Sequence, residues 1–140
     1  MIRSRVSVRD ARLRDVARDV AGRFSLRLVV LFGSAARQEQ DPRDLDLGVV
    51  GSGPLDVVAI TNALTRALGT QSIDVTDLRR ADPVLLALAA RDGRALFETE
   101  PGVFAQFVSV AARRFADTRK FRDAQAQALR AAIGPRSAAP

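Results

Sequence analysis

Four residue types that carry much of protein chemistry are missing from the 140-residue chain, which has no cysteine, histidine, tyrosine or tryptophan. Without cysteine there are no disulfides, and without cysteine and histidine the usual zinc sites are excluded. A Ser-His-Asp triad, a Cys-His pair and any histidine acid-base step are excluded as well. Carboxylates, hydroxyls, arginines, backbone amides and the single Lys120 remain. That inventory favours metal-assisted phosphoryl or nucleotidyl transfer.

Long hydrophobic runs are also missing. No segment approaches the roughly 18 apolar residues of a membrane-spanning helix, and the opening Met-Ile-Arg-Ser-Arg-Val has no apolar signal-peptide core. We therefore expect a cytoplasmic protein with no membrane partner. With 47% hydrophobic and 27% charged residues, the composition is that of a globular protein, and we expect one domain over residues 1–140.

Negative charge is in the minority, with 16 Asp and Glu against 22 Lys and Arg and a formal net charge of +6. A basic surface attracts polyanions, so a nucleic acid, a nucleotide and an acidic protein are all candidate partners. No interleaving of basic and aromatic residues indicates a stacking platform for single strands. Nucleic acid binding therefore rests on net charge alone and is not expected.

Helical and extended patterns alternate along the chain, which predicts an α/β fold. The expected helices cover about 8–22, 55–68, 83–92 and 101–132, and the expected strands cover about 26–32, 45–49, 71–78 and 95–98. Gly69 is placed to cap one helix, and Asp82-Pro83 to open the next as N-cap and first-turn proline. Residues 8–98 form the expected core of the domain, and residues 133–140 are expected to be a frayed tail.

The closing helix has two halves of different character. An apolar stripe is followed by a basic and polar stretch: Phe104, Phe107, Val108, Ala111 and Phe115, then Arg113, Arg114, Arg119, Lys120 and Arg122. The stripe is interpreted as core. The basic stretch is the better candidate for contact with a partner.

Two motifs on the first two expected strands supply a Gly-Ser turn and a pair of carboxylates. Leu31-Phe-Gly-Ser34 closes one strand, and Asp44-Leu-Asp-Leu47 opens the next. Residues two apart on a strand lie about 6.5 Å apart on the same side, so Asp44 and Asp46 converge on one space. Two carboxylates 4–5 Å apart repel by roughly 3–4 kcal/mol at an effective dielectric near 20, which a divalent cation relieves. Ligation by oxygen alone favours Mg²⁺ or Mn²⁺ over zinc.

Further groups complete this candidate site. Gly33 lets the backbone approach a phosphate closely, and the following amides and the Ser34 hydroxyl can donate to it. Asp74 lies on the polar face of the third strand, opposite Ile73 and Val75. If that strand lies beside the second, Asp74 becomes a third carboxylate that shares a metal and accepts the proton of an attacking hydroxyl.

The order of these motifs resembles the DNA polymerase β-like nucleotidyltransferase superfamily, and within it the minimal nucleotidyltransferases that serve as antitoxins beside HEPN-domain toxins. The matching segments are Leu31-Phe-Gly-Ser34, Asp44-Leu-Asp-Leu47 and Ile73-Asp-Val-Thr-Asp-Leu78. The resemblance continues through the helix at Pro83 to the closing helix. The spacer 35–43 is short for the family, and Gln38 stands where the family usually has glycine.

The resemblance implies a small mixed β-sheet flanked by helices, a long C-terminal helix and an ATP-dependent adenylyltransferase. The implied acceptor is a tyrosine hydroxyl of a cognate HEPN ribonuclease toxin, bound in a hetero-oligomer. This chain lacks the histidine that the toxin's active site needs, so it is not the toxin. The implied roles are phosphate binding by Gly33, Ser34 and Arg37, metal binding by Asp44, Asp46 and Asp74, and contact with the incoming hydroxyl by Asp74.

Two alternatives stay open. The first is a nucleotidyltransferase for a small molecule, as in the aminoglycoside-modifying branch of the superfamily, which we do not favour because no appended substrate domain is apparent. The second is a non-catalytic antitoxin that only masks its partner. Replacement of Asp44 and Asp46 by asparagine separates masking from catalysis, since a purely masking protein would still neutralise its partner.

Overall fold

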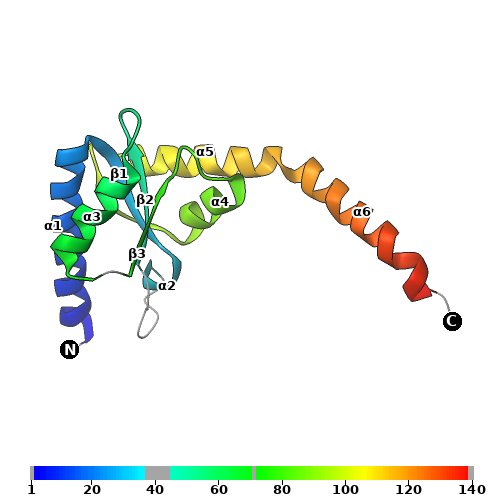
Figure 1. Cartoon of the computed structure of the whole chain (residues 1–140), viewed down its shortest axis with the longest axis horizontal. Helices are drawn as coiled ribbons and strands as arrows, with labels where there is room; N and C mark the ends of the chain where they lie inside the picture. The colour runs from blue at the N-terminus through cyan, green and yellow to red at the C-terminus, as the bar shows by residue number, and fades with distance from the viewer. Residues whose placement is uncertain (1, 37–44, 71, 139–140) are drawn as a thin grey trace.

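A computed structural model describes residues 2–36, 45–70 and 72–138, and it shows a four-stranded sheet between helices (Figure 1). The elements in chain order are α1 (Ile2–Phe24), β1 (Leu26–Phe32), α2 (Gly33–Ala36), β2 (Leu45–Gly51), α3 (Val57–Leu68), β3 (Ile73–Asp77), α4 (Pro83–Asp92), β4 (Arg94–Glu98), α5 (Val103–Asp117) and α6 (Arg119–Ala138). The predicted α/β fold is confirmed.

The sheet is mixed, with the strand order β3-β2-β1-β4. Strand β1 runs antiparallel to both β2 and β4, whereas β2 and β3 are parallel. The parallel pair needs a crossover connection, which helix α3 supplies. The two strands that carry the predicted carboxylates are therefore neighbours, in the same direction and at one edge of the sheet.

Apolar side chains of β1 supply a core on each face of the sheet. Val29 and Leu31 pack on the face covered by α1 and α3, and Leu28 and Val30 pack on the face covered by α4 and α5 (Figure 1). All four are at most 1% exposed. Because both faces are covered, the strand has a continuous apolar run instead of an alternating one.

The predicted caps are confirmed. Gly69 adopts a φ of 69°, and its N–H donates to the Thr65 carbonyl at 2.9 Å. The Asp82 carboxylate accepts a hydrogen bond from the Leu85 N–H at 2.9 Å, with Pro83 in the first turn. Gly69 thus ends α3 and Asp82 begins α4, and these two helices lie on opposite faces of the sheet.

The closing helix differs from the prediction. Instead of one helix over about 101–132, two helices meet at Thr118. The Thr118 hydroxyl donates to the Phe115 carbonyl at 2.7 Å, and the Arg122 guanidinium lies 3.9 Å from the centroid of the Phe115 ring. Helix α6 then continues to Ala138, where a frayed tail was predicted, and extends away from the body of the molecule (Figure 1).

Helix α1 also starts earlier than its pattern indicated, at Ile2 instead of near Val8. Its inner face meets the sheet through Leu13, Ala17 and Val20. At the edge of the sheet, the Asp10 carboxylate accepts two hydrogen bonds from Arg94, at 2.7 and 3.2 Å. Among the described helices, none combines the length and apolar composition that crossing a membrane requires.

Candidate active site

A tight turn at Gly33 brings the backbone against a carboxylate. Strand β1 ends at Phe32, and Gly33 begins α2 with a φ of +74°. Residues other than glycine disfavour this backbone conformation. A Cβ at this position would also overlap the Asp46 Oδ2 atom and lie 3.2 Å from Asp46 Cγ. Glycine is therefore needed here both for backbone conformation and for close approach.

Asp46 and Asp74 form the centre of the candidate site. They are register partners on the parallel strands β2 and β3, and Asp46 also pairs with Phe32 on β1. Neighbouring strands lie about 4.8 Å apart, and paired residues project from the same face. The prediction that the third strand lies beside the second is confirmed. Asp46 is half-buried and Asp74 is exposed.

A cleft of about 300 Å³ lies over this pair. Its floor is the sheet end, with Gly33, Asp46 and Asp74, and its opposite wall is α4, with Leu85 and Leu88. The face is the one that packs against α4 and α5, because Leu45 and Leu47, on either side of Asp46, belong to the opposite core. The carboxylates thus lie at the edge of the apolar interface between the sheet and α4.

Two further polar residues that the sequence analysis missed line the cleft, Thr76 and Asp92. Thr76 lies two residues after Asp74 on the same face of β3, so its position follows from strand geometry. Asp92 lies in the last turn of α4 and binds the Arg91 guanidinium through two contacts of 3.1 Å. The hydrogen bond to Asp92 raises the pKa of Arg91. Asp92 reaches the cleft because of how α4 packs on the sheet, and no pattern in the sequence predicts that packing.

The other predicted site residues are only partly described. Arg37 and Asp44 lie outside the described residues, and so does the side chain of Ser34. Within the described ranges, no three Asp, Glu, His or Cys residues gather closely enough to hold a metal ion. The described pair, Asp46 and Asp74, offers oxygen donors alone, which fits Mg²⁺ or Mn²⁺. Asp44 directly precedes β2 and stays a predicted ligand.

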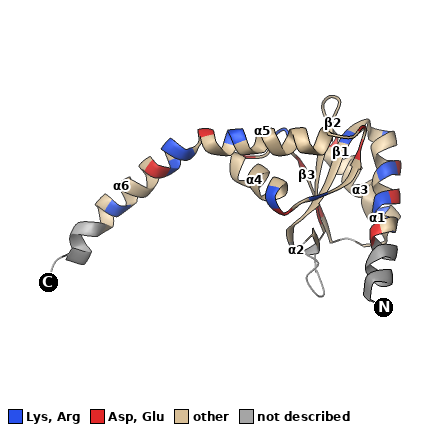
Figure 2. Cartoon of the chain, turned by 180° about the vertical axis from the view of Figure 1, so that it is seen from behind, with Lys and Arg blue, Asp and Glu red and all other residues tan. Residues whose placement is uncertain are grey.

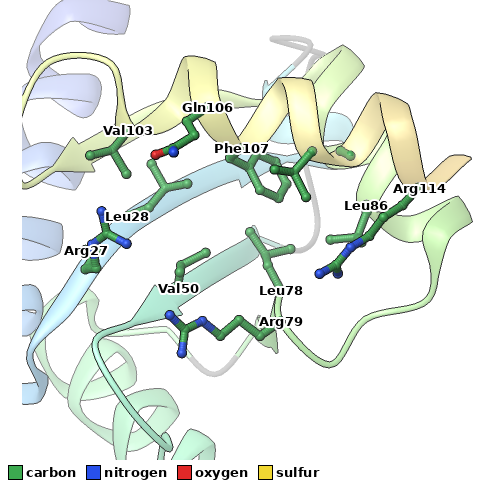
Figure 3. Close-up of a pocket in the computed structure, with 12 residues that line it drawn as sticks. Arg27, Leu28, Val50, Leu78, Arg79, Leu86, Val103, Gln106, Phe107 and Arg114 are labelled. Carbon is green, nitrogen blue, oxygen red and sulfur yellow. The ribbon is translucent and has the colours of Figure 1, made fainter.

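A second cavity, of about 200 Å³, lies at the opposite end of the sheet, beneath α5 (Figure 3). Its base is apolar, with Leu28, Val50 and Leu78, and three arginines surround it: Arg27, Arg79 and Arg114. Its described lining contains no carboxylate. Of these two cavities, only the cleft at Asp46 and Asp74 therefore has carboxylates in its described lining.

Paired carboxylates on neighbouring strands, beside a glycine turn and without histidine or cysteine, are a donor set that suits phosphoryl or nucleotidyl transfer. The family model described as "Polymerase beta, Nucleotidyltransferase" matches residues 18–102, which is more than half of the chain. The chain belongs to this nucleotidyltransferase family. The matched segment includes Gly33, Asp46 and Asp74 and ends before α5.

Several solved structures with the same fold are toxin–antitoxin complexes. One chain of a toxin–antitoxin structure with AMP-PNP is 23% identical, with a TM-score of 0.73, and the match covers 83% of this chain and 97% of that one. A complex of a tri-AMPylated Shewanella oneidensis HEPN toxin with its MNT antitoxin contains a chain that is 23% identical, with a TM-score of 0.69 and coverages of 89% and 98%. These likenesses show the polymerase β-like fold of this chain.

A mutant of an MntA-HpeT toxin–antitoxin complex contains a further similar chain. It is 27% identical, with a TM-score of 0.65, and the match covers 75% of this chain and 85% of that one. No curated protein matches the chain. The chain is thus a nucleotidyltransferase-family protein similar to the MNT antitoxins of toxin–antitoxin complexes.

Proposed function

We propose that this chain is an antitoxin-type adenylyltransferase that moves AMP from ATP to a tyrosine hydroxyl of a cognate HEPN ribonuclease toxin. The observation that carries the proposal is the register pairing of Asp46 with Asp74 beside the Gly33 turn. Support comes from the family match and from neighbours described with AMP-PNP and with a tri-AMPylated HEPN toxin. Modification of the toxin would silence it.

The transfer step needs a base, a phosphate clamp and charge neutralisation. The acceptor oxygen attacks the α-phosphorus of ATP, its proton passes to the Asp74 carboxylate, and the bond from the α-phosphorus to the bridging oxygen breaks to release pyrophosphate. Gly33, Ser34 and Arg37 would hold the β- and γ-phosphates. Asp44, Asp46 and Asp74 would hold Mg²⁺, which supplies neutralisation of the triphosphate and the leaving pyrophosphate.

The charge of the cleft makes the reaction depend on a cation. Its described lining contains Asp46, Asp74 and Asp92 and no basic side chain, although Arg91 binds Asp92 from outside. Such a site repels a bare triphosphate, and metal removal by a chelator is expected to abolish both ATP binding and transfer.

The shape of the cleft favours a protein acceptor over a small molecule. At about 300 Å³ it is at the lower limit of ligand pockets, and the sheet end and α4 supply its described walls. A small cleft of this kind favours an acceptor that approaches from outside over one that is enclosed together with the nucleotide. A macromolecule brings its own surface to the reaction, so it needs no second enclosing pocket.

The test is transfer from ATP labelled in its α-phosphate to the purified HEPN protein in the presence of Mg²⁺. We expect label on the HEPN protein with the unmodified chain and its loss with Asp46→Asn. Asp77→Asn is the matched control, because Asp77 lies at the far end of β3 and its carboxylate accepts a hydrogen bond from the Arg79 N–H at 3.1 Å, which an asparagine preserves.

The control variant is expected to transfer AMP normally. If the unmodified chain leaves the HEPN protein unlabelled, the proposal is wrong. If Asp46→Asn still neutralises the toxin in full, neutralisation is masking and not catalysis.

A further inference from the structure

Exposed large hydrophobic side chains are unevenly distributed over the described surface. Six are found, and five of them lie on α4 and α6: Val84, Leu88, Phe121, Leu129 and Ile133, with Val58 on α3 as the sixth. Single exposed apolar residues are ordinary, whereas a gathering of them marks an interaction surface. Val84 and Leu88 lie on α4, the helix that lines the cleft, whereas Val58 lies on α3, across the sheet from it. Helix α6, with the other three, extends away from the body of the molecule (Figure 1).

An apolar groove of about 440 Å³ runs between α4 and α5. Val84 and Leu88 line it from α4, and Val108, Ala112 and Phe115 line it from α5. Leu88 also lines the catalytic cleft. Leu88 is thus a common wall of the groove and the cleft, and an acceptor seated in the groove lies beside the space over Asp46 and Asp74.

Positive charge predominates on the C-terminal helices, at the end of α5 and along α6. Figure 2 shows Lys and Arg on both helices, and among the described residues from 113 onward the exposed basic side chains outnumber the exposed acidic ones. The basic set is Arg113, Arg114, Arg119, Lys120 and Arg130, and the acidic set is Asp117 and Asp123. A second copy of this chain would bring the same positive charge and a net +6, so its approach is opposed. An acidic protein face is complementary.

Helix α6 gives a second reason to expect a partner on this side. It extends from the body with Phe121, Leu129 and Ile133 exposed at 66%, 62% and 54%. A single helix of 20 residues has marginal stability in water without tertiary packing. The exposed apolar side chains supply a surface that such packing would cover.

We propose that the protein carrying the acceptor hydroxyl docks in the α4–α5 groove, through an apolar segment over Val84 and acidic side chains facing the basic residues of α6. The inference rests on the proposed function, because it names where the acceptor of that reaction binds. Docking in the groove brings the acceptor past Leu88 to the carboxylates. The surface thus selects the substrate, while the cleft performs the transfer.

The chain offers a matched pair of variants to test this inference. Val84 and Val58 are the second residues of α4 and α3, and they are 50% and 70% exposed. A glutamate near a helix N-terminus is favourable, so Val84→Glu and Val58→Glu should both fold. Circular dichroism and thermal unfolding check that they do. Only the first variant places a charge in the groove.

Binding of the HEPN protein is measured by calorimetry without nucleotide, and AMP transfer is measured against HEPN protein concentration. We expect Val84→Glu to weaken binding about tenfold or more and to raise the KM for the HEPN protein with kcat unchanged, while Val58→Glu matches the unmodified chain. Equal binding by the two variants would overturn the proposal. So would self-association of the unmodified chain that Val84→Glu abolishes, since a second copy would then occupy the groove.

The calorimetric result separates this inference from the proposed function. If no AMP reaches the HEPN protein but Val84→Glu still weakens binding, the docking surface stands and the reaction is wrong. If AMP is transferred and Val84→Glu binds like Val58→Glu, the reaction stands and the docking surface is wrong.

Discussion

The two ends of the sheet share strands but differ in chemistry. At one end, Asp46 and Asp74 face a cleft beside the Gly33 turn, and at the other end arginines surround an apolar cavity (Figure 3). Leu78 packs over Gly48, between Asp46 and Val50 along β2, and is 1% exposed. The same face thus changes from acidic to apolar within a few residues.

The difference bears on which end of the sheet suits the proposed nucleotide transfer. Positive charge alone, as at Arg27, Arg79 and Arg114, attracts anions but provides no ligand for a cation. Paired carboxylates beside a backbone turn provide that ligand and space for a phosphate. The predictions below separate the two ends, from the largest expected effect to the smallest.

Asp74→Asn is expected to have the largest effect. The substitution keeps the size of the side chain but removes the predicted base and one metal ligand, so kcat for AMP transfer should fall by about 10²–10⁴-fold. Arg79→Gln, at the opposite end of the sheet, should leave kcat unchanged. Initial rates with saturating ATP and HEPN protein measure both. Equal losses in the two variants would place the reaction elsewhere.

Gly33→Ala should come next. The fold requires a φ of +74° at this position, which alanine disfavours, and the added Cβ would overlap the Asp46 carboxylate. The free energy of unfolding should therefore fall by roughly 1–2 kcal/mol. AMP transfer should fall about 10-fold or more, because the Asp46 carboxylate is displaced. Gly69→Ala is the control, because its φ is +69° and no atom lies within 4 Å of the added Cβ. A similar loss of stability with full transfer activity is expected there.

The smallest effect on activity is expected from Gly48→Ala. Its Cβ would lie 2.8 Å from the Leu78 side chain, away from the reacting groups. Overpacking of this kind should lower the free energy of unfolding by about 1–3 kcal/mol. The remaining folded protein should transfer AMP at the normal rate. Urea unfolding and active-site titration measure the two quantities. A loss of activity without a loss of stability would show that the packing of Leu78 over Gly48 contributes to the reaction, which contradicts the comparison.

Much of the fold could be predicted because local chemistry marks its boundaries. The predicted limits of β1 are the observed ones, Leu26–Phe32, since a buried run lies between Ser25, with a φ of 54°, and Gly33. The caps at Gly69 and Asp82 are equally local. The pairing of Asp46 with Asp74 was predicted on the condition that their strands are neighbours, and the sheet order satisfies it.

The remainder depends on tertiary packing. The break at Thr118 contains neither glycine nor proline, and its hydrogen bonds to Phe115 and the stacking of Arg122 arise only in three dimensions. The position of Asp92 in the cleft follows from how α4 lies across the sheet. The groove that joins Val84 to the cleft has the same origin.

The most direct test of the central claim is the intact mass of the HEPN protein after incubation with ATP, Mg²⁺ and this chain. The account predicts a mass increase of one or more AMP units, with loss of ribonuclease activity, and no increase when Asp46→Asn replaces the unmodified chain. An unchanged mass together with full neutralisation of the ribonuclease would contradict it.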